Sequence, residues 1–346
     1  MMGKTPLSVS SPADILAYVL HTLGFTPQDS FVFLTMHGKQ LGATLRLDAP
    51  GPEVSPAQYA ATVRHYLAHD GEADGVLSIA YTDRATIDGT KPYSEHSTAI
   101  DNALDTAGTP IRDSWLVTSE QWETYFCQDA DCCTPRPLDE VTDSMLNAHL
   151  IYEGSNPTAG TITIPDYTGN TPETLDRIGD IITGWTITDP ADWTAPVMTG
   201  CRALWQETLG TVPDEDTALH LIAALHAPAV RDRIIADTIS TDDDPDTFAQ
   251  VVIGRYPARP DWDRVDATQN LLTGLLSSTP SEARAPLFAF LGWIHWYKGR
   301  SSIAAQYLTT AQDTDREHRL TQLLTQLVNT GTLPVCVTSK DTAYQR

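Results

Sequence analysis

Three of the chain's five cysteines lie within one stretch, Trp122 to Pro135, with the sequence WETYFCQDADCCTP. Cysteine thiolates are ligands that structural zinc prefers, which makes Cys127, Cys132 and Cys133 the metal-ligand candidates of the chain. A tetrahedral site needs a fourth ligand, and no second cysteine pair follows at short range. The set is therefore incomplete, and we predict no cofactor, with zinc as the alternative. The residues that could supply the fourth ligand are His149, Asp129 and Asp131.

The same stretch allows a redox role or a structural role. Cys127 could close a small loop by pairing with Cys132 or Cys133, at a rate set by thiolate fraction and exposure. A nucleophilic cysteine needs a basic or helix-terminal environment, whereas Asp129 and Asp131 disfavour the thiolate. The favoured interpretation is structural, with small cysteines packed in a turn after the last strand. The aromatic residues expected to cover this turn are Trp122, Tyr125 and Phe126.

Two further sets of polar residues have spacings that could support a site. His65 and His69 are four residues apart on one expected helix, but its apolar stripe lies on another face, which indicates a solvated position. Asp48, Asp83 and Asp113 lie near expected strand ends, where α/β sheets place their ligands. Polar loop residues have the same pattern, so this edge is not the favoured site. The alternative function is an enzyme, or a binder of a small molecule or metal, with its site near this sheet edge and the loop from Cys127 to Cys133.

Known catalytic motifs are missing from the sequence. It contains no phosphate-binding Walker loop, no dinucleotide-binding glycine motif, no nucleophile elbow and no HExxH zinc motif. The run Asp242-Asp243-Asp244 lacks the ligand spacing and closing glutamate of a calcium loop, and indicates a solvated loop. Whether the protein is an enzyme stays open, and a non-enzymatic role is favoured.

Composition narrows the classes of partner. The 346 residues include 45 acidic and 22 basic side chains, a formal charge of −23 that opposes direct binding to nucleic acid or an anionic membrane. Mimicry of a nucleic acid is a further alternative, although the carboxylates are scattered rather than laid in rows. No secretion signal or membrane span is visible, and an odd number of cysteines suits a reducing compartment, so we expect a cytoplasmic protein.

The first half of the chain predicts an α/β sandwich with a mixed sheet, because strand-like runs alternate with capped helices. Helices are expected to begin after Ser11 and Ser55, each followed by proline, and from Ser94. Asp14 lies where a carboxylate meets the exposed amides of the first helix, and Gln58 is placed to complete a capping box with Ser55. A hairpin is expected around residues 37–40. The strand-like runs are 31–36, 41–47, 76–81, 112–118 and 122–126.

The second half predicts an all-α domain. Residues 154–170 are rich in Gly, Pro, Thr and Ser, with one β-like run at Thr161 to Ile164, and form the expected linker or insertion. Helices are expected to start at Thr171 and at Asp189, and then to follow one another with short loops. We therefore predict an α/β domain at 1–153, the linker at 154–170, a helical domain at 171–334 and a flexible tail at 335–346.

Several motifs resemble one family. These are the cysteine stretch (W-x-x-Y-x-C, then C-C-x-P), S-P-A-D-I-L-A near Ser11, L-G-F-x-P-x-D-S from Leu23 to Ser30, and V-R-D at Val230 to Asp232. Together they resemble the actinobacterial domain of unknown function family numbered 4192, over about Ser11 to Pro334. The resemblance implies an actinobacterial or actinophage origin and no known activity. Thr134 departs from the pattern, since the family usually has proline directly after the paired cysteines.

Near the end of the helical half, small residues suggest a tetratricopeptide-like helix pair. Gly292, Gly299, Ala304 and Ala311 follow that spacing, with the aromatic position displaced and the closing proline absent, so a simple helical bundle is the alternative. We expect the helical domain to bind an unidentified protein partner as a non-enzymatic adaptor, in an oligomeric state the sequence leaves open. The partner-contact candidates are Trp293, Trp296, Tyr297 and Tyr307.

Overall fold

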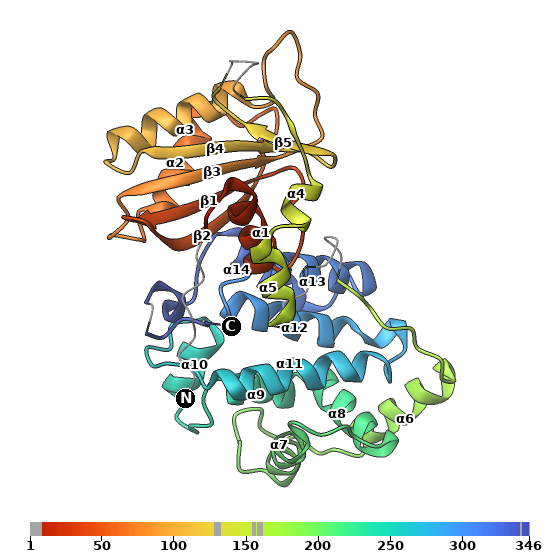
Figure 1. Cartoon of the computed structure of the whole chain (residues 1–346). Coiled ribbons are helices and arrows are strands. Elements are labelled where there is room, and N and C mark those ends of the chain that lie inside the picture. The colour runs from red at the N-terminus through yellow and green to blue at the C-terminus, as the bar shows by residue number, and fades with distance from the viewer. Residues whose placement is uncertain (1–8, 128–132, 154–156, 158–161, 340, 346) are drawn as a thin grey trace. The chain divides into compact units, whose positions relative to one another are not determined.

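The computed structural model describes residues 9–127, 133–153, 157, 162–339 and 341–345 (Figure 1). The chain divides into two compact units, Met1–Thr161 and Ile162–Arg346, a division that falls inside the expected linker. Each unit is described here by itself.

The first unit is built on a mixed sheet, which confirms the expected fold class. Its six described strands are ordered β2-β1-β3-β4-β5-β6 (Figure 1). The β3–β4 pair is parallel and the other pairs are antiparallel. β1 and β2 form the expected hairpin, where Gly38 has a φ of +63° that favours glycine. The strands are β1 (Ser30–His37), β2 (Gln40–Asp48), β3 (Gly75–Tyr81), β4 (Ile111–Val117), β5 (Gln121–Thr124) and β6 (Arg136–Pro137).

Helices cover both faces of this sheet. Successive side chains of a strand point to opposite faces, and β1 carries apolar residues on both, so each face must be buried. Val32 and Leu34 of β1 pack in a core with helix α1 (Pro12–Leu23). Phe31 and Phe33 pack in a second core with α2 (Pro56–Leu67) and α3 (Ser94–Thr106). The expected capping box is present at the start of α2, and Ser11 caps α1 as predicted, where Asp14 completes a second capping box.

Three short elements after β5 were not anticipated. They are β6, α4 (Asp139–Thr142) and α5 (Met145–Tyr152), and both helices pack against α1. His21 of α1 and Asn147 of α5 are joined by a 2.8 Å hydrogen bond. Elements this short carry too few residues for a periodic pattern.

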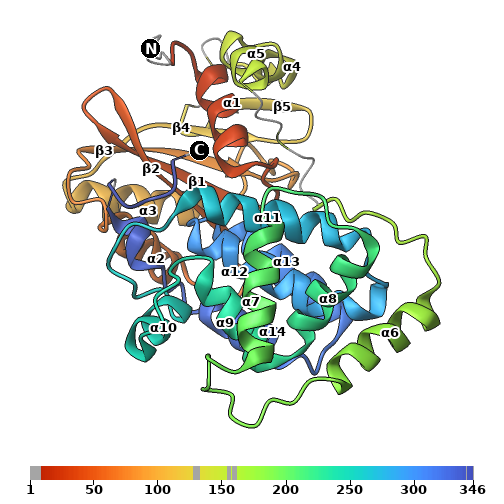
Figure 2. The same ribbon diagram turned by 90° about the horizontal axis from the view of Figure 1, so that it is seen from below.

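The second unit is helical, as expected, and α12 lies at its centre. Every residue of α12 is buried, and α12 packs against α8, α11, α13 and α14 (Figure 2). The helices are α6 (Thr171–Thr183), α7 (Pro196–Thr208), α8 (Glu215–His226), α9 (Pro228–Asp237), α10 (Pro245–Val252), α11 (Trp262–Leu276), α12 (Ala285–Tyr297), α13 (Ser301–Thr314) and α14 (Arg319–Asn329), with short 3₁₀ helices η1 (Ser281–Ala283) and η2 (Val335–Thr338).

Three details of this unit correct the sequence-based expectations. The helix expected from Asp189 begins only at Pro196, because Asp189 and Asp192 accept bonds from backbone amides two residues on and form turns instead. No strand forms at residues 162–164, while Thr161 lies outside the described residues. The described residues of the expected flexible tail are folded against the core, and Cys336 is only 1% exposed.

Candidate functional site

Of the cysteine stretch, the structure describes Trp122 to Cys127 and Cys133 to Pro135. Cys127 and Cys133 are joined by a disulfide, one of the two pairings predicted for a closed loop. Cys132 lies outside the described residues. Within the described part of the chain, no group of three or more His, Cys, Asp or Glu side chains could hold a metal. In this disulfide-bonded state Cys127 and Cys133 lack the thiolates that zinc requires, and zinc stays only the alternative to the prediction of no cofactor.

Two of the three aromatic residues expected to cover the cysteine turn are instead buried in the cores on the two faces of the sheet, Trp122 with α1 and Tyr125 with α2 and α3. Trp122 and Tyr125 are buried, and the Tyr125 hydroxyl donates to the carbonyl of Pro92. The guanidinium of Arg136 lies 5.1 Å from the Trp122 ring centroid. Phe126 is 44% exposed, which corrects its expected place in the lid. It lies two residues after Thr124, the last residue of β5, and its ring meets that of Tyr125 in a T-shaped contact.

His65 of α2 and His69, two residues beyond the end of that helix, face solvent, as predicted. Both side chains are exposed, and Nδ1 of His69 lies 3.1 Å from the His65 carbonyl oxygen. Their exposure agrees with the solvated position that the sequence predicted.

The sheet-edge aspartates do not converge on one site. Asp48 of β2 and Tyr81 of β3 both pair with Ser30, so Asp48 and Asp83 lie at the same end of the sheet. Asp113 pairs with Leu77, towards the opposite end of β3. Asp48 forms an ion pair with Arg46, and Asp83 accepts a bond from the Ser119 amide.

The aromatic residues proposed as partner contacts build the core instead. Trp293, Trp296 and Tyr297 are each 1% exposed, and Tyr307 is half-buried with its ring stacked on His295. The physical reason is that α12 has no polar face. Such a helix is stable only where other elements pack against all of its sides. Burial removes three of these four candidates from the surface.

Small residues let α12 and α13 cross closely, as their spacing predicted. A Cβ atom on Gly292 would lie 2.9 Å from Cγ of Leu308 and 3.3 Å from the carbonyl oxygen of Ala304. Only glycine fits there without a shift of the neighbouring helix. The likeness to a tetratricopeptide unit beyond this crossing stays a prediction.

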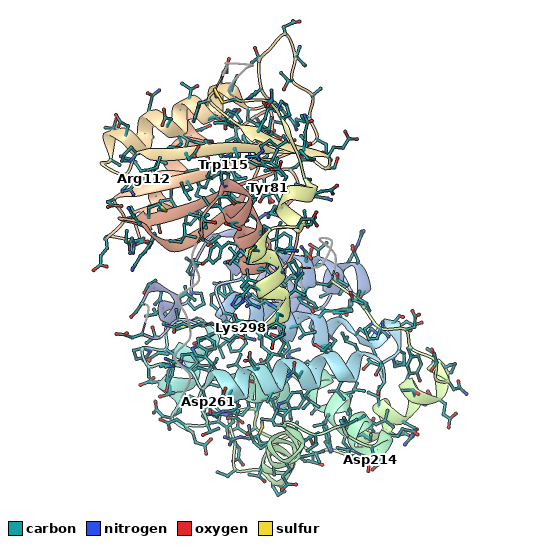
Figure 3. All side chains as sticks on the ribbon, viewed as in Figure 1. Tyr81, Arg112, Trp115, Asp214, Asp261 and Lys298 are labelled. Carbon is teal, nitrogen blue, oxygen red and sulfur yellow. A yellow bond between two sulfur atoms is a disulfide. The ribbon has the colours of Figure 1, made fainter. Side chains whose placement is uncertain are left out.

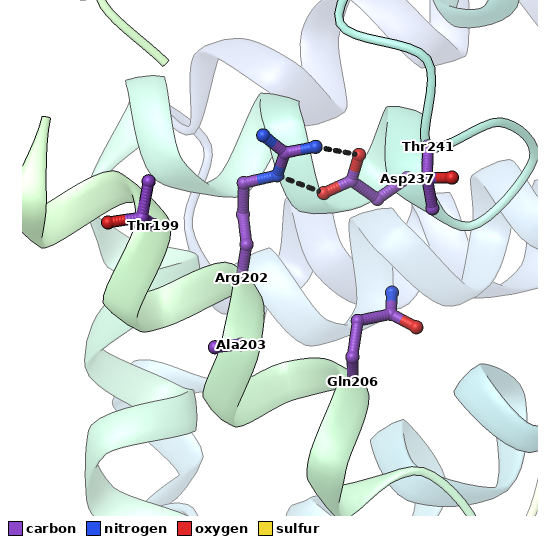
Figure 4. Close-up of a pocket in the computed structure, with 6 residues that line it drawn as sticks. All are labelled: Thr199, Arg202, Ala203, Gln206, Asp237 and Thr241. Carbon is purple, nitrogen blue, oxygen red and sulfur yellow. Dashed lines mark hydrogen bonds and ion pairs between the residues drawn. The ribbon is translucent and has the colours of Figure 1, made fainter. Parts of the chain in front are cut away.

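A shallow hollow of about 270 Å³ lies between α7 and the end of α9 (Figure 4). Arg202 donates to both carboxylate oxygens of Asp237, at 2.7 and 3.0 Å, and pairs with Asp243 at 2.8 Å. The fully buried Arg233 donates to the same Asp237 at 2.6 Å. Because these arginine and aspartate side chains are already paired with one another, we interpret the ion pairs as a structural link between α7 and α9, and not as a ligand site. The lining residues are Thr199, Arg202, Ala203, Gln206, Asp237 and Thr241.

The most developed binding arrangement is where residues 341–345 pack on the helical unit, around the side chain of Tyr344. The Tyr344 hydroxyl donates to Asp266 Oδ1 at 2.9 Å, and its ring meets Trp262 edge-on at 5.2 Å between centroids. Nζ of Lys298 lies 4.5 Å from the ring centroid, and the Arg300 guanidinium lies 5.1 Å from it. These four residues, Trp262, Asp266, Lys298 and Arg300, are called the tyrosine pocket.

Two of the charged groups of the tyrosine pocket, Asp266 and Lys298, form an ion pair with each other. Lys298, labelled in Figure 3, has a side chain only 1% exposed and donates to Asp266 Oδ1 and Gln269 Oε1, each at 2.6 Å. The buried ammonium therefore has two oxygen partners from α11 that do not depend on Tyr344. The pocket would keep these bonds if the tyrosine left.

Side chains of the helical unit also hold the backbone of this segment. Nε1 of Trp262 donates to the carbonyl of Thr342, and Nη1 of Arg259 donates to the carbonyl of Asp341, each at 3.1 Å. Donors that bind main-chain carbonyls recognise a peptide without regard to its side chains, while the pocket selects one side chain.

The preceding residues are anchored by α12. Nε1 of Trp296 donates to the carbonyl of Thr332 at 2.8 Å, and the Cys336 thiol donates to the carbonyl of Tyr297 at 3.6 Å. Burial raises the pKa of Cys336 to about 12, so this thiol stays protonated and serves as a donor. Two of the predicted contact residues thus hold a segment of their own chain.

Comparison with known proteins places the chain in a family. A family model described as a domain of unknown function, DUF4192, matches residues 12–335. The chain belongs to the DUF4192 family. No curated protein and no solved structure was found to match it. No helix among the described residues is both long and apolar enough to cross a membrane.

The motifs that resemble DUF4192 have clear structural roles here. Ser11 caps α1, and Gly24 ends it in a left-handed conformation. Asp29 accepts a 2.7 Å bond from the Thr82 hydroxyl and so joins the start of β1 to the end of β3. Arg231 of the V-R-D motif bonds both Asp232 and His318. These contacts stabilise the fold, so they carry no information about a ligand.

Sequence reasoning missed the tyrosine pocket of this DUF4192 protein. Tyr344 and Asp266 are 78 residues apart, and neither belongs to a recognisable motif. One signal was available: Trp262, Lys298 and Arg300 each lie at or just beyond a helix end, where polar side chains commonly bind a neighbouring segment.

Proposed function

We propose that this DUF4192 protein is a non-enzymatic binding protein whose helical unit receives a peptide segment of a protein partner at the tyrosine pocket. The observation that carries the proposal is the seated segment 341–345, in which one tyrosine enters the pocket while Trp262 and Arg259 bind the main chain. In this conformation the chain's own segment occupies the site in place of the partner.

The energetics favour exchange of this segment. Seating one large aromatic side chain contributes about 1.5–3 kcal/mol, and each net hydrogen bond about 1 kcal/mol. Because Lys298 keeps Asp266 and Gln269, release of Tyr344 leaves no buried charge unpaired. A partner segment at a higher effective concentration or with better contacts would therefore displace the segment.

Peptide binding to a vacated pocket tests the function. The full chain with Tyr344→Ala is titrated into a fluorescein-labelled peptide of residues 337–345, VTSKDTAYQ, and fluorescence polarisation is measured. We expect saturable one-to-one binding to this variant and at least about tenfold weaker binding to the wild-type chain, whose own segment competes.

A pair of arginine variants provides the matched control. In the Tyr344→Ala background, Arg259→Ala removes the donor to the peptide backbone and should weaken binding severalfold. Arg255→Ala changes an exposed arginine in the same loop between α10 and α11 and should leave binding unchanged. Absence of saturable binding to a folded Tyr344→Ala chain would overturn the proposal.

Amide hydrogen exchange gives a second test that needs no variant. In the wild-type chain, residues 341–345 should exchange far faster than α12, because an exchangeable segment opens without unfolding the core. Exchange of this segment at the slow rate of α12 would show that it is an integral part of the core and would contradict the proposed function.

A further inference from the structure

The charges around the Tyr344 hydroxyl are arranged unevenly. At the hydroxyl end of the ring stands the Asp266 carboxylate, whose Oδ1 also accepts the Lys298 bond. The two cations lie near the ring itself, at 4.5 and 5.1 Å from its centroid. The pocket therefore presents an acceptor to the hydroxyl and positive charge to the π-electrons.

We infer that the tyrosine pocket is specific for a peptide segment centred on an unmodified tyrosine, and rejects both phenylalanine and phosphotyrosine. This inference rests on the proposed function, because it names the ligand class of the same site. Asp266 selects the hydroxyl as a hydrogen-bond donor, and Trp262, Lys298 and Arg300 select the electron-rich ring.

Phenylalanine fills the same volume but removes a donor to a charged acceptor. The Asp266 carboxylate would keep Lys298 and lose the hydroxyl, so part of its hydrogen-bonding capacity would go unmet inside a half-buried pocket. Sites that bind a ligand hydroxyl reject the analogue that lacks it for this reason.

Phosphotyrosine adds negative charge and volume at the hydroxyl end of the ring, which faces the Asp266 carboxylate. Its phosphate carries about −1.5 to −2 charges at neutral pH and would replace a neutral hydroxyl 2.9 Å from a carboxylate oxygen. Lys298 does not offset this repulsion, because its ammonium is already bound to Asp266 and Gln269 and is buried. A phosphate-binding site would instead present several donors with no carboxylate between them.

A set of four peptides tests this specificity on the Tyr344→Ala chain. The labelled 337–345 peptide is prepared with tyrosine, phenylalanine, phosphotyrosine or alanine at the position of Tyr344. We expect phenylalanine to bind about tenfold more weakly than tyrosine, the loss of one hydrogen bond to a charged group. Phosphotyrosine should bind at least about 100-fold more weakly, and alanine should show no saturable binding.

The outcomes separate the two claims. If no peptide binds, the proposed function fails together with its ligand class. If phenylalanine matches tyrosine, or phosphotyrosine binds more tightly, the site still binds a peptide but the specificity inferred here is overturned.

Two changes in the pocket assign the specificity to its groups. Asp266→Asn should reduce the preference for tyrosine over phenylalanine, because it removes the charge that accepts the hydroxyl. Arg300→Ala should weaken both peptides equally and leave their ratio unchanged, because its guanidinium faces the ring and not the hydroxyl. If Asp266→Asn fails to fold, the ratio measured with Arg300→Ala still decides, since a change in that ratio contradicts the assigned roles.

Discussion

His318 shows how a single buried side chain makes the helical unit sensitive to acid. Nη1 of Arg231 can only donate, so Nε2 of His318 accepts that 3.3 Å bond, and Nδ1 donates to the Thr321 hydroxyl at 2.7 Å. Burial and the nearby charge of Arg231 lower the pKa of His318 to about 4, although Asp315 acts in the opposite direction. Burial also lowers the pKa of His226, which faces the same cluster.

This geometry predicts a loss of stability on acidification. Between about pH 6.5, the ordinary pKa of histidine, and pH 4 the unfolded chain binds a proton that folded His318 does not. The free energy of unfolding should therefore fall as pH falls through that window, by at most about 3 kcal/mol before the reduction that partial exposure brings. Urea unfolding at several pH values checks this. His318→Gln should flatten the profile, whereas substitution of the exposed His69, by His69→Gln, should not. An unchanged profile for His318→Gln would contradict the assignment.

At the scale of elements, α12 and α13 cross closely because Gly292 has no side chain at the point of contact. Gly292→Ala would place a Cβ 2.9 Å from Leu308, an overpacking that we expect to cost about 1–3 kcal/mol. Gly274 of α11 has no atom within 4 Å of the corresponding position, so Gly274→Ala should stabilise by about 0.5–1 kcal/mol through helix propensity. Thermal unfolding of both variants measures the difference. Equal effects of the two changes would show that the helices do not pack closely at Gly292.

The elements also show what local sequence can and cannot predict. The starts of α1 and α2 were predicted because Ser11 with Asp14, and Ser55 with Gln58, satisfy helix amides within four residues of the chain. The start of α7 was placed too early, since Asp189 begins a turn with the same residue types as a helix cap.

The roles of the candidate residues depended on tertiary contacts. The aromatic residues of α12 were assigned to the surface, although a helix without a polar face indicates a buried position. The tyrosine pocket joins residues from α11, from the end of α12 and from the segment near Tyr344, and no local pattern links these stretches. The fold class was therefore predictable, whereas the candidate site required the structure.

At the scale of the whole molecule, the two units have cores built from separate stretches of chain. The cores on the two faces of the sheet draw their buried residues from 13–141, and the helical core draws its buried residues from 178–336. The disulfide between Cys127 and Cys133 belongs to the first unit. A cross-link stabilises chiefly by restricting the unfolded chain, so its effect should be confined to the unit that contains it.

Removal of this disulfide should therefore shift one of two unfolding transitions. Closing so short a loop contributes about 2 kcal/mol in the chain-entropy model, so Cys127→Ser with Cys133→Ser should lower the transition of the first unit by several degrees. Leu291→Ala, in the helical core, should lower the other transition by creating a cavity. Differential scanning calorimetry of the two variants assigns each transition to a unit. A single transition that both variants shift together would show that the units unfold as one cooperative body, and would place the stabilising effect of the disulfide on the whole chain.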